Sequence, residues 1–215
     1  MNDAIVIGGS RGIGKAISDA LKSINCKVVS TSKSQIDTSD LDSVRNFVKE
    51  NTETDILVLN TGGPPPKEFG SITQEDWEKY HNQLFLGFCL LLQGIRIREG
   101  GYVFLISSNV IKEPNPKLII SSAYRSAFSS VFKILSKDFA QKNISCINIA
   151  PGPINTDRTR DLVDNVEEFQ AGLPMKRLGE PTEIGNFVKS IVENKIRYLS
   201  GVVINFDGAN SNYIF

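Results

Sequence analysis

The stretch Ala4–Leu21, AIVIGGSRGIGKAISDAL, decides the fold of this chain. It begins with a short apolar run, Ala4–Ile7, that is typical of a buried parallel strand. The chain then turns through four glycines and continues with apolar residues at helical spacing. Strand, glycine turn and helix in this order begin a nucleotide-binding βαβ unit, because a diphosphate lies against bare backbone N–H groups at the start of the helix. The glycines are Gly8, Gly9, Gly12 and Gly14.

Length and charge exclude several classes of protein. The 215 residues fit one domain, residues 1–215, with a sizeable core. Basic and acidic residues balance at 24 each, so we expect neither nucleic acid nor a membrane as a partner. The longest apolar run, Leu84–Leu92, is too short to span a bilayer. The first three residues lead directly into the first strand, so we expect no signal peptide.

The cysteine and histidine content points to a reducing compartment. Three cysteines lie far apart in apolar surroundings, as reduced core residues of a cytoplasmic protein do. One histidine and no cysteine cluster argue against a metal site. We therefore expect a cytoplasmic protein with no metal. The cysteines are Cys26, Cys89 and Cys146.

The spacing Gly8-xxx-Gly12-x-Gly14 resembles the N-terminal fingerprint of the short-chain dehydrogenase/reductase family. Other motifs resemble that family in the same order along nearly the whole chain. The resemblance implies an α/β fold with one doubly wound (Rossmann) parallel sheet of about seven strands and helices on both faces. The further motifs are Asn60–Gly63, Ser107-Ser108, Pro151–Thr156 and Pro174–Glu183.

The end of the expected second strand, Cys26–Thr31, indicates which nucleotide binds. An acid at this point holds the ribose hydroxyls of NAD, whereas a base suits the 2′-phosphate of NADP. The strand is followed by Ser32-Lys33 with no acid, and Arg11 lies in the glycine turn. Lys33 alone is also compatible with a solvated loop, but the missing acid favours NADP(H) over NAD(H).

The following segment, Ile36–Asp40, resembles the family's third-strand end, where the resemblance implies that Asp37 accepts a hydrogen bond from the adenine amino group. Too few residues precede it for the helix that the family usually has there. We expect a helix over Ser43–Glu50, capped by Ser39 or Asp40.

The resemblance also implies a complete set of nucleotide contacts. Ile154 is expected to pair its backbone with the nicotinamide carboxamide, and Thr156 to contact the carboxamide or the diphosphate. The stiff Pro64–Pro66 segment is expected to lie over the cofactor, and Asp157–Met175 to form a short substrate lid. The expected cofactor-binding residues are Gly8, Ser10, Arg11, Gly12, Ile13, Gly14, Thr31, Ser32, Lys33, Asp37, Asn60, Gly62, Arg125, Pro151, Gly152, Ile154 and Thr156.

The catalytic positions depart from the family pattern. The family has a serine after its fifth strand, then a tyrosine and a lysine four residues apart on the next helix; Ser108 matches the serine. If Tyr124 matches the tyrosine, Phe128 stands where the lysine belongs. The spacing between Ser108 and the Pro-Gly motif favours another register, in which Ser121 replaces the tyrosine and Arg125 the lysine.

A long helix is expected over Thr73–Arg98, beginning at a Thr73 cap. The family also has a catalytic asparagine on this helix, and alignment on Trp77 and Gly87 puts Leu84, not Asn82, at its position. Apolar residues crowd one face over Leu84–Ile95, and this helix forms a subunit interface in the family. We therefore expect a homodimer or homotetramer, with that face serving as core or as subunit contact.

Two functions remain open on these residues. The first is an NADP(H)-dependent, 3-oxoacyl reductase-like oxidoreductase for a small carbonyl/alcohol pair. Ser108 would hold the carbonyl, Arg125 the ribose, and Tyr124 or a water on Ser121 would pass the proton. The second is a non-catalytic NADP-binding sensor or assembly partner, favoured by the altered catalytic set.

Overall fold

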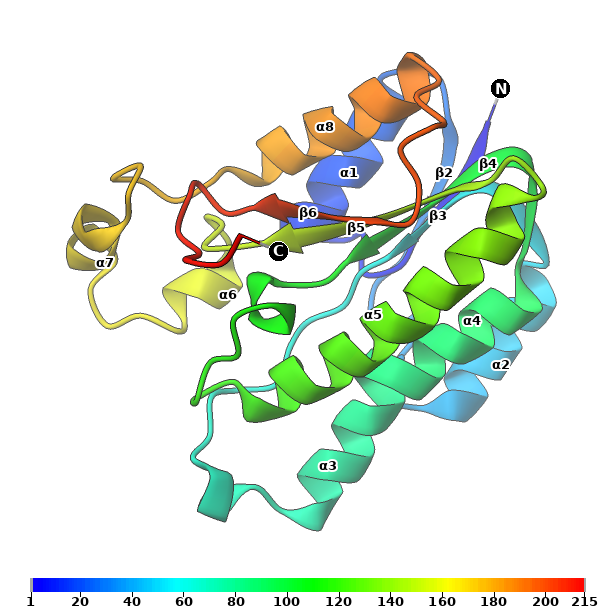
Figure 1. The fold of residues 1–215 in the computed structure, drawn as a ribbon. Helices are drawn as coiled ribbons and strands as arrows, with labels where there is room; N and C mark the ends of the chain where they lie inside the picture. The colour runs from blue at the N-terminus through cyan, green and yellow to red at the C-terminus, as the bar shows by residue number, and fades with distance from the viewer. Residues whose placement is uncertain (1, 215) are drawn as a thin grey trace.

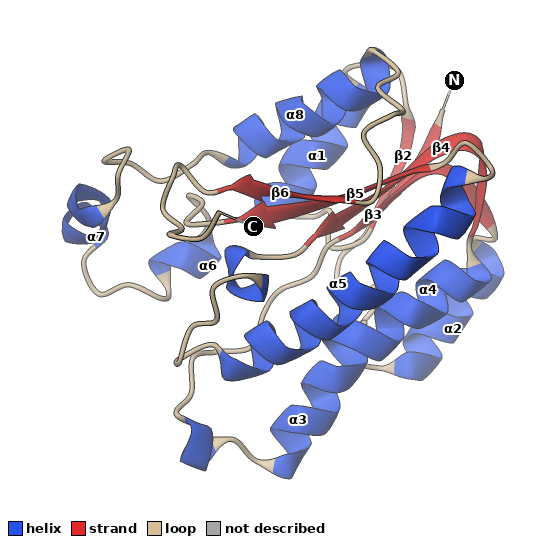
Figure 2. Cartoon of the chain, in the orientation of Figure 1, coloured by secondary structure: helices blue, strands red, loops and turns tan. Residues whose placement is uncertain are grey.

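The computed structural model describes residues 2–214 and consists of one parallel sheet with helices on both faces (Figures 1 and 2). The strand order is β2-β1-β3-β4-β5-β6, and every pairing is parallel. This doubly wound sheet confirms the predicted fold class, with six strands instead of about seven. The strands are β1 (Asp3–Val6), β2 (Lys27–Ser30), β3 (Glu53–Leu59), β4 (Arg96–Ile106), β5 (Ser145–Pro151) and β6 (Val202–Phe206).

Helices bury both faces of the sheet because alternate strand residues point to opposite sides. In β3, Ile56 and Val58 pack in the cluster under α1 (Gly12–Lys22) and α8 (Pro181–Glu193). Leu57 and Leu59 pack in the opposite cluster, under three of the four helices on that side, while the fourth contributes Tyr80 to a smaller cluster of its own. Within residues 2–214 no helix is long and apolar enough to cross a membrane. The four helices are α2 (Leu41–Glu50), α3 (Gln74–His81), α4 (Gly87–Gly94) and α5 (Ile119–Ala140).

The expected third strand at Ile36–Asp37 is absent, which accounts for the difference in strand number. Ile36 is buried, but its N–H bonds to the carbonyl of Ser32, so this segment closes into a turn. A second turn follows at once, from Asp40 N to Asp37 O. β2 therefore remains the edge of the sheet.

The helix predicted over Thr73–Arg98 ends earlier than expected. It runs through α3, a π-helical segment (Asn82–Leu86) and α4, and stops at Gly94. β4 begins at Arg96, where Ile95 and Ile97 are buried on either side of an exposed arginine. This alternation is a strand pattern, and Arg96 pairs in register with Glu53.

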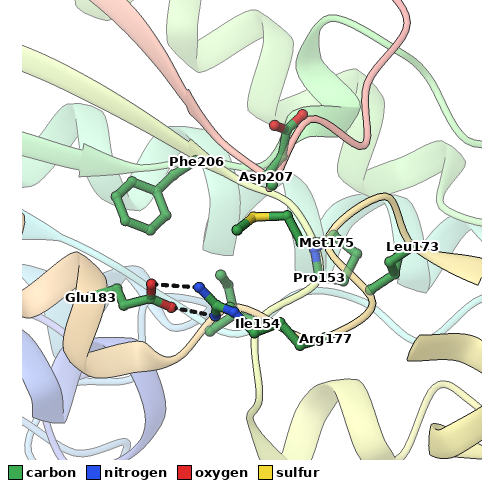
Figure 3. A pocket seen from close by; sticks show the side chains of 10 residues that line it. Pro153, Ile154, Leu173, Met175, Arg177, Glu183, Phe206 and Asp207 are labelled. Atoms are coloured by element: carbon green, nitrogen blue, oxygen red, sulfur yellow. Dashed lines mark hydrogen bonds and ion pairs between the residues drawn. The ribbon is translucent and has the colours of Figure 1, made fainter. Parts of the chain in front are cut away.

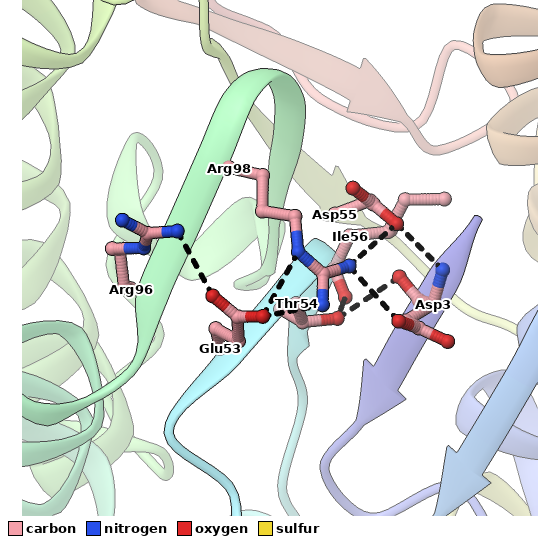
Figure 4. A network of polar contacts seen from close by, with 7 residues as sticks. All are labelled: Asp3, Glu53, Thr54, Asp55, Ile56, Arg96 and Arg98. Atoms are coloured by element: carbon pink, nitrogen blue, oxygen red, sulfur yellow. Dashed lines mark hydrogen bonds and ion pairs between the residues drawn. The ribbon is translucent and has the colours of Figure 1, made fainter.

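Charged residues join three strands at their amino ends (Figure 4). The Arg98 guanidinium lies 2.9 Å from Asp3, 2.8 Å from Glu53 and 3.0 Å from Asp55. These carboxylates come from β1 and β3, whereas Arg98 comes from β4. The network thus fixes the sheet at the end opposite to the glycine turn.

Candidate active site

The glycine turn between β1 and α1 is a bare backbone surface. Gly8 and Gly12 have positive φ angles of 62° and 53°, which residues with side chains rarely adopt. A Cβ on Gly14 would lie 2.1 Å from the carbonyl oxygen of Gly8. The turn therefore requires glycine at these positions, and it exposes the N-terminus of α1 without side chains in front of it.

Two residues that we expected to contact the cofactor hold this turn in place. The fully buried Thr31 hydroxyl accepts a hydrogen bond from Gly8 N at 3.1 Å. The Asn60 side chain donates to Gly8 O at 3.0 Å. Ser30 adds a third bond, from its hydroxyl to Gly9 O at 2.7 Å. Thr31 and Asn60 thus support the site through the turn.

The residues expected to bind phosphate lie in the glycine turn and in the loop after β2. Ser10 and Arg11 are exposed, Ile13 is half-buried, and the Ser32 hydroxyl lies 2.8 Å from that of Ser34. Lys33 is exposed and lies 3.2 Å from the Asp37 carboxylate. Arg11, the residue before α1, and Lys33, in the loop after β2, are thus both exposed to solvent.

Asp37 is engaged within its own turn. Its carboxylate accepts from the Ser39 N–H at 2.9 Å and from the Ser39 hydroxyl at 2.7 Å. Burial opposes ionisation of this carboxyl, but the bonds from Ser39 and Lys33 outweigh it and hold the pKa of Asp37 below its ordinary value. Asp37 is therefore charged at neutral pH.

The loop after β5 brings the Pro-Gly motif beside the glycine turn. A Cβ on Gly12 would lie 3.4 Å from the Thr156 side chain, so the two segments touch. Ile154 forms an isolated parallel bridge with Gly179. That bridge uses Pro153 O and Asn155 N, so the N–H and C=O of Ile154 point the other way. Pro151 ends β5, and Gly152 N bonds to Phe206 O.

Arg125 is the most extensively bonded side chain at the carboxyl edge of the sheet. It is 8% exposed and donates to the carbonyls of Ile106 (3.2 Å), Ser107 (3.3 Å) and Thr61 (3.1 Å). Its Nε donates to the Ser121 hydroxyl at 3.2 Å. Four of its five N–H groups are thus occupied, which leaves one on Nη2. Burial, and then the nearby Arg158 charge, lower the pKa of Arg125 to about 10, so it is charged at neutral pH.

Ser108 follows directly on the strand end that Arg125 binds. Its hydroxyl caps the short turn Asn109–Ile111, accepting from Val110 N at 3.4 Å. Ser107 is instead buried and donates to Asn148 on β5 at 2.5 Å. The half-buried Ser108 is therefore the serine with access to the site.

Tyr124 lies one helical turn after Ser121 on α5 and packs against α3. Its ring makes edge contacts with Trp77 at 5.8 Å and with His81 at 5.5 Å between centroids. Burial raises the pKa of its phenol. Phe128, one turn on, is buried among aromatic rings of the core. The arginine, not this phenylalanine, thus reaches the strand ends.

The sequence did not indicate two further residues near these groups. Gln83, in the π-helical segment, donates to Gly62 O at 2.8 Å and to the Thr61 hydroxyl at 3.2 Å. Its neighbour Leu84 is buried in the core. Arg158, in the short helix α6 (Asp157–Arg160), donates to Pro64 O. The only sequence signal for Arg158 was its place in the expected lid.

A small cavity of about 60 Å³ lies behind the Pro-Gly motif, and Figure 3 shows its lining. Ile154, Met175 and Phe206 line it beside Arg177, which binds Glu183 through two bonds of 2.8 and 2.9 Å. Arg177, and then the Glu180 N–H, lower the pKa of Glu183 to about 2. This pair braces the segment that connects helix α7 (Val166–Gly172) to α8.

Comparison with known proteins assigns the family. The family model described as "Enoyl-(Acyl carrier protein) reductase" matches residues 34–209. The chain is 28% identical to the 3-oxoacyl-(acyl-carrier-protein) reductase FabG of Chlamydia trachomatis, with 95% of each chain covered.

Solved structures share the fold. A blue fluorescent protein from a metagenomic library, in complex with NADPH, superimposes with a TM-score of 0.88 at 23% identity and 98% coverage of both chains. YwfH, an NADPH-dependent reductase involved in bacilysin biosynthesis, gives 0.82 at 23% identity and 99% coverage of both chains. Since the family model spans most of the sequence, the chain belongs to the short-chain dehydrogenase/reductase family.

Proposed function

We propose that this protein is an NADP(H)-dependent oxidoreductase that interconverts a small carbonyl compound and its alcohol in the manner of a 3-oxoacyl reductase. One observation carries the proposal. The bare glycine turn after β1 lies at the carboxyl ends of the strands, where Ser108 and Arg125 also lie at the end of β4. Relatives named as 3-oxoacyl reductases and structural neighbours described with NADPH support it. The geometry of the turn agrees with such a ligand, because Gly8, Gly12 and Gly14 form a tight turn without side chains directly before the N-terminus of α1.

Different residues of the proposed site bind different parts of NADP(H). The turn from Gly8 to Gly14 and the N-terminus of α1 hold the diphosphate, and Arg11 with Lys33 hold the 2′-phosphate. Arg125 offers its remaining N–H to a ribose hydroxyl, and the Ile154 backbone pairs with the carboxamide. Bound NADPH would supply the hydride.

The proton path is the unusual part of this proposal. Ser108 holds the carbonyl oxygen, as a hydrogen-bond donor at the place where negative charge develops. The Ser121 hydroxyl accepts from Arg125, so its hydrogen is free to hold a water. A serine is too weak an acid to donate alone. We propose that this water, or the phenol of Tyr124, passes the proton.

The altered catalytic set also supports a second candidate, a non-catalytic NADP-binding sensor or assembly partner. Tyr124 packs against Trp77 and His81, and Ser121 stands in the tyrosine position. A cytoplasmic homodimer or homotetramer fits either function.

The test is an NADPH-consumption assay against small ketones and 3-oxoacyl thioesters. The wild type is compared with Ser108→Ala, Ser121→Ala and Tyr124→Phe, with the exposed Tyr198→Phe as control. We expect Ser108→Ala to lower kcat/KM by about 100-fold, as loss of a carbonyl-oxygen donor does. Turnover that survives all three substitutions would contradict the assigned roles. Tight NADPH binding without turnover of any compound would establish the sensor function instead.

A further inference from the structure

Arg125 and Arg158 bring two positive charges together in a confined place. A Cβ added at Gly63 would lie 3.7 Å from Arg158 Nη2, 3.8 Å from Arg125 Nη2 and 3.9 Å from the Ser121 hydroxyl oxygen. Three groups able to donate hydrogen bonds thus surround one point, one from α6 and two from α5. Because residue 63 is glycine, no side chain fills that point.

No carboxylate of residues 2–214 forms an ion pair with either arginine. Arg125 bonds to neutral oxygens, and among the described residues Arg158 bonds to the carbonyl of Pro64 alone. Arg158 therefore keeps four of its N–H groups for a ligand. Its neighbour in α6, Arg160, is by contrast exposed and pairs with Asp157 at 2.7 Å.

Two partly or fully buried guanidinium groups repel each other, and an anion bound between them would offset that repulsion. The direction of the pKa shifts agrees: burial lowers the pKa of Arg158 against the opposite effects of Tyr80 and Asp161, and burial, then the charge of Arg158, lowers the pKa of Arg125. A planar carboxylate matches the fork of a guanidinium group and gains charge-assisted hydrogen bonds there.

We propose that Arg158, with the charge of Arg125 beside it, binds a carboxylate on the substrate, so that the enzyme acts on short oxo acids. This inference rests on the proposed function and narrows its substrate class. Arg125 donates a hydrogen bond to Ser107 O, and Ser108 is the next residue. The serine that we propose to bind the carbonyl therefore lies at the same strand end as the anion position. A carbonyl group one or two carbons from a carboxylate fits that proximity.

The test compares acids with their neutral esters. Pyruvate and acetoacetate are assayed against methyl pyruvate and methyl acetoacetate with NADPH. For the preferred acid we expect Arg158→Gln to raise KM by about 10–100-fold, as loss of a charge-assisted pair does. We expect its effect on the ester to be under twofold, Arg158→Lys to retain part of the affinity, and Arg160→Gln to match the wild type.

Calorimetry with NADP+ bound separates this inference from the proposed function, because no reduction occurs in that complex. Binding of either acid that Arg158→Gln abolishes would support the carboxylate site even if no compound is reduced. Turnover that is equal for acids and esters, and indifferent to Arg158→Gln, would overturn the site while the proposed function stands. Failure of both acids to bind the wild type, or binding of inorganic phosphate in their place, would also overturn it.

Discussion

Arg125 joins three parts of the protein through one side chain. Its hydrogen bonds reach the loop after β3 at Thr61, the end of β4 at Ile106 and Ser107, and its own helix at Ser121. A lysine has three donors on one nitrogen and cannot span the same set. The arginine therefore both fixes the strand ends and supplies a buried positive charge beside them.

The glycine turn gives the sharpest prediction at the residue scale. Gly14→Ala places a Cβ 2.1 Å from Gly8 O, so we expect a loss of about 1–3 kcal/mol in the free energy of unfolding. We also expect NADPH binding at least about tenfold weaker, equivalent to about 1.4 kcal/mol. Denaturant unfolding and calorimetry measure the two effects. Gly70→Ala is the control, since nothing lies within 4 Å of its Cβ; equal effects of both substitutions would refute the steric argument.

Sequence reasoning identified residues whose role follows from local spacing. The glycines and Ser108 belong to motifs in which neighbouring residues fix the conformation. Thr31 was expected at the cofactor, and the structure adds that its buried hydroxyl accepts from the N–H of Gly8 in the glycine turn. Gln83 and Arg158 bind the Gly62–Pro64 loop from distant parts of the chain, and no local pattern encodes such a contact.

At the scale of elements, the N-terminus of α2 is capped by a single side chain. Sequence reasoning left Ser39 and Asp40 as alternatives, and the structure has Asp40 as the cap, accepting from the N–H groups of Asp42 and Ser43. Ser39 is occupied with Asp37. The carboxylate also interacts favourably with the positive end of the helix.

This cap predicts a measurable loss of stability. Asp40→Ala leaves two N–H groups without their partner and should lower the free energy of unfolding by about 1 kcal/mol. Glu50→Ala, at the other end of the same helix, is the matched control and should change it by less than about 0.5 kcal/mol. Urea denaturation monitored by circular dichroism compares them. A stability for Asp40→Ala equal to that of Glu50→Ala would contradict the assignment of the cap.

The two errors in the elements have one physical origin. Ile36 is buried as a strand residue would be, and Ile95 and Ile97 are buried as residues at the end of a helix would be. Periodicity reports which residues are buried, but not which backbone partner they bond to. The turn at Ser32–Ile36 and the pairing of Arg96 with Glu53 depend on those partners.

At the scale of the whole molecule, Arg98 makes stability depend on pH. Hydrogen bonds from Arg98 hold the pKa of Glu53 below its ordinary value, so the stabilisation is complete above that value and disappears as pH falls through the lowered one. Arg98→Gln should therefore lower Tm most at pH values above the ordinary pKa of a glutamate, and the difference from wild type should shrink as pH falls below that pKa. Arg96→Gln, which removes a single exposed pair, is the control. A Tm difference for Arg98→Gln that does not vary with pH would contradict the network's role.

The central claim is that the chain binds NADP(H) at the glycine turn and distinguishes it by charge at the end of β2. Calorimetric titration of the wild type with NADPH and with NADH tests it most directly. We predict at least about tenfold tighter binding of NADPH, which corresponds to about 1.4 kcal/mol. The double variant Arg11→Glu, Lys33→Glu should lose that preference. Equal affinity for the two nucleotides, or tighter binding of NADH, would contradict the account.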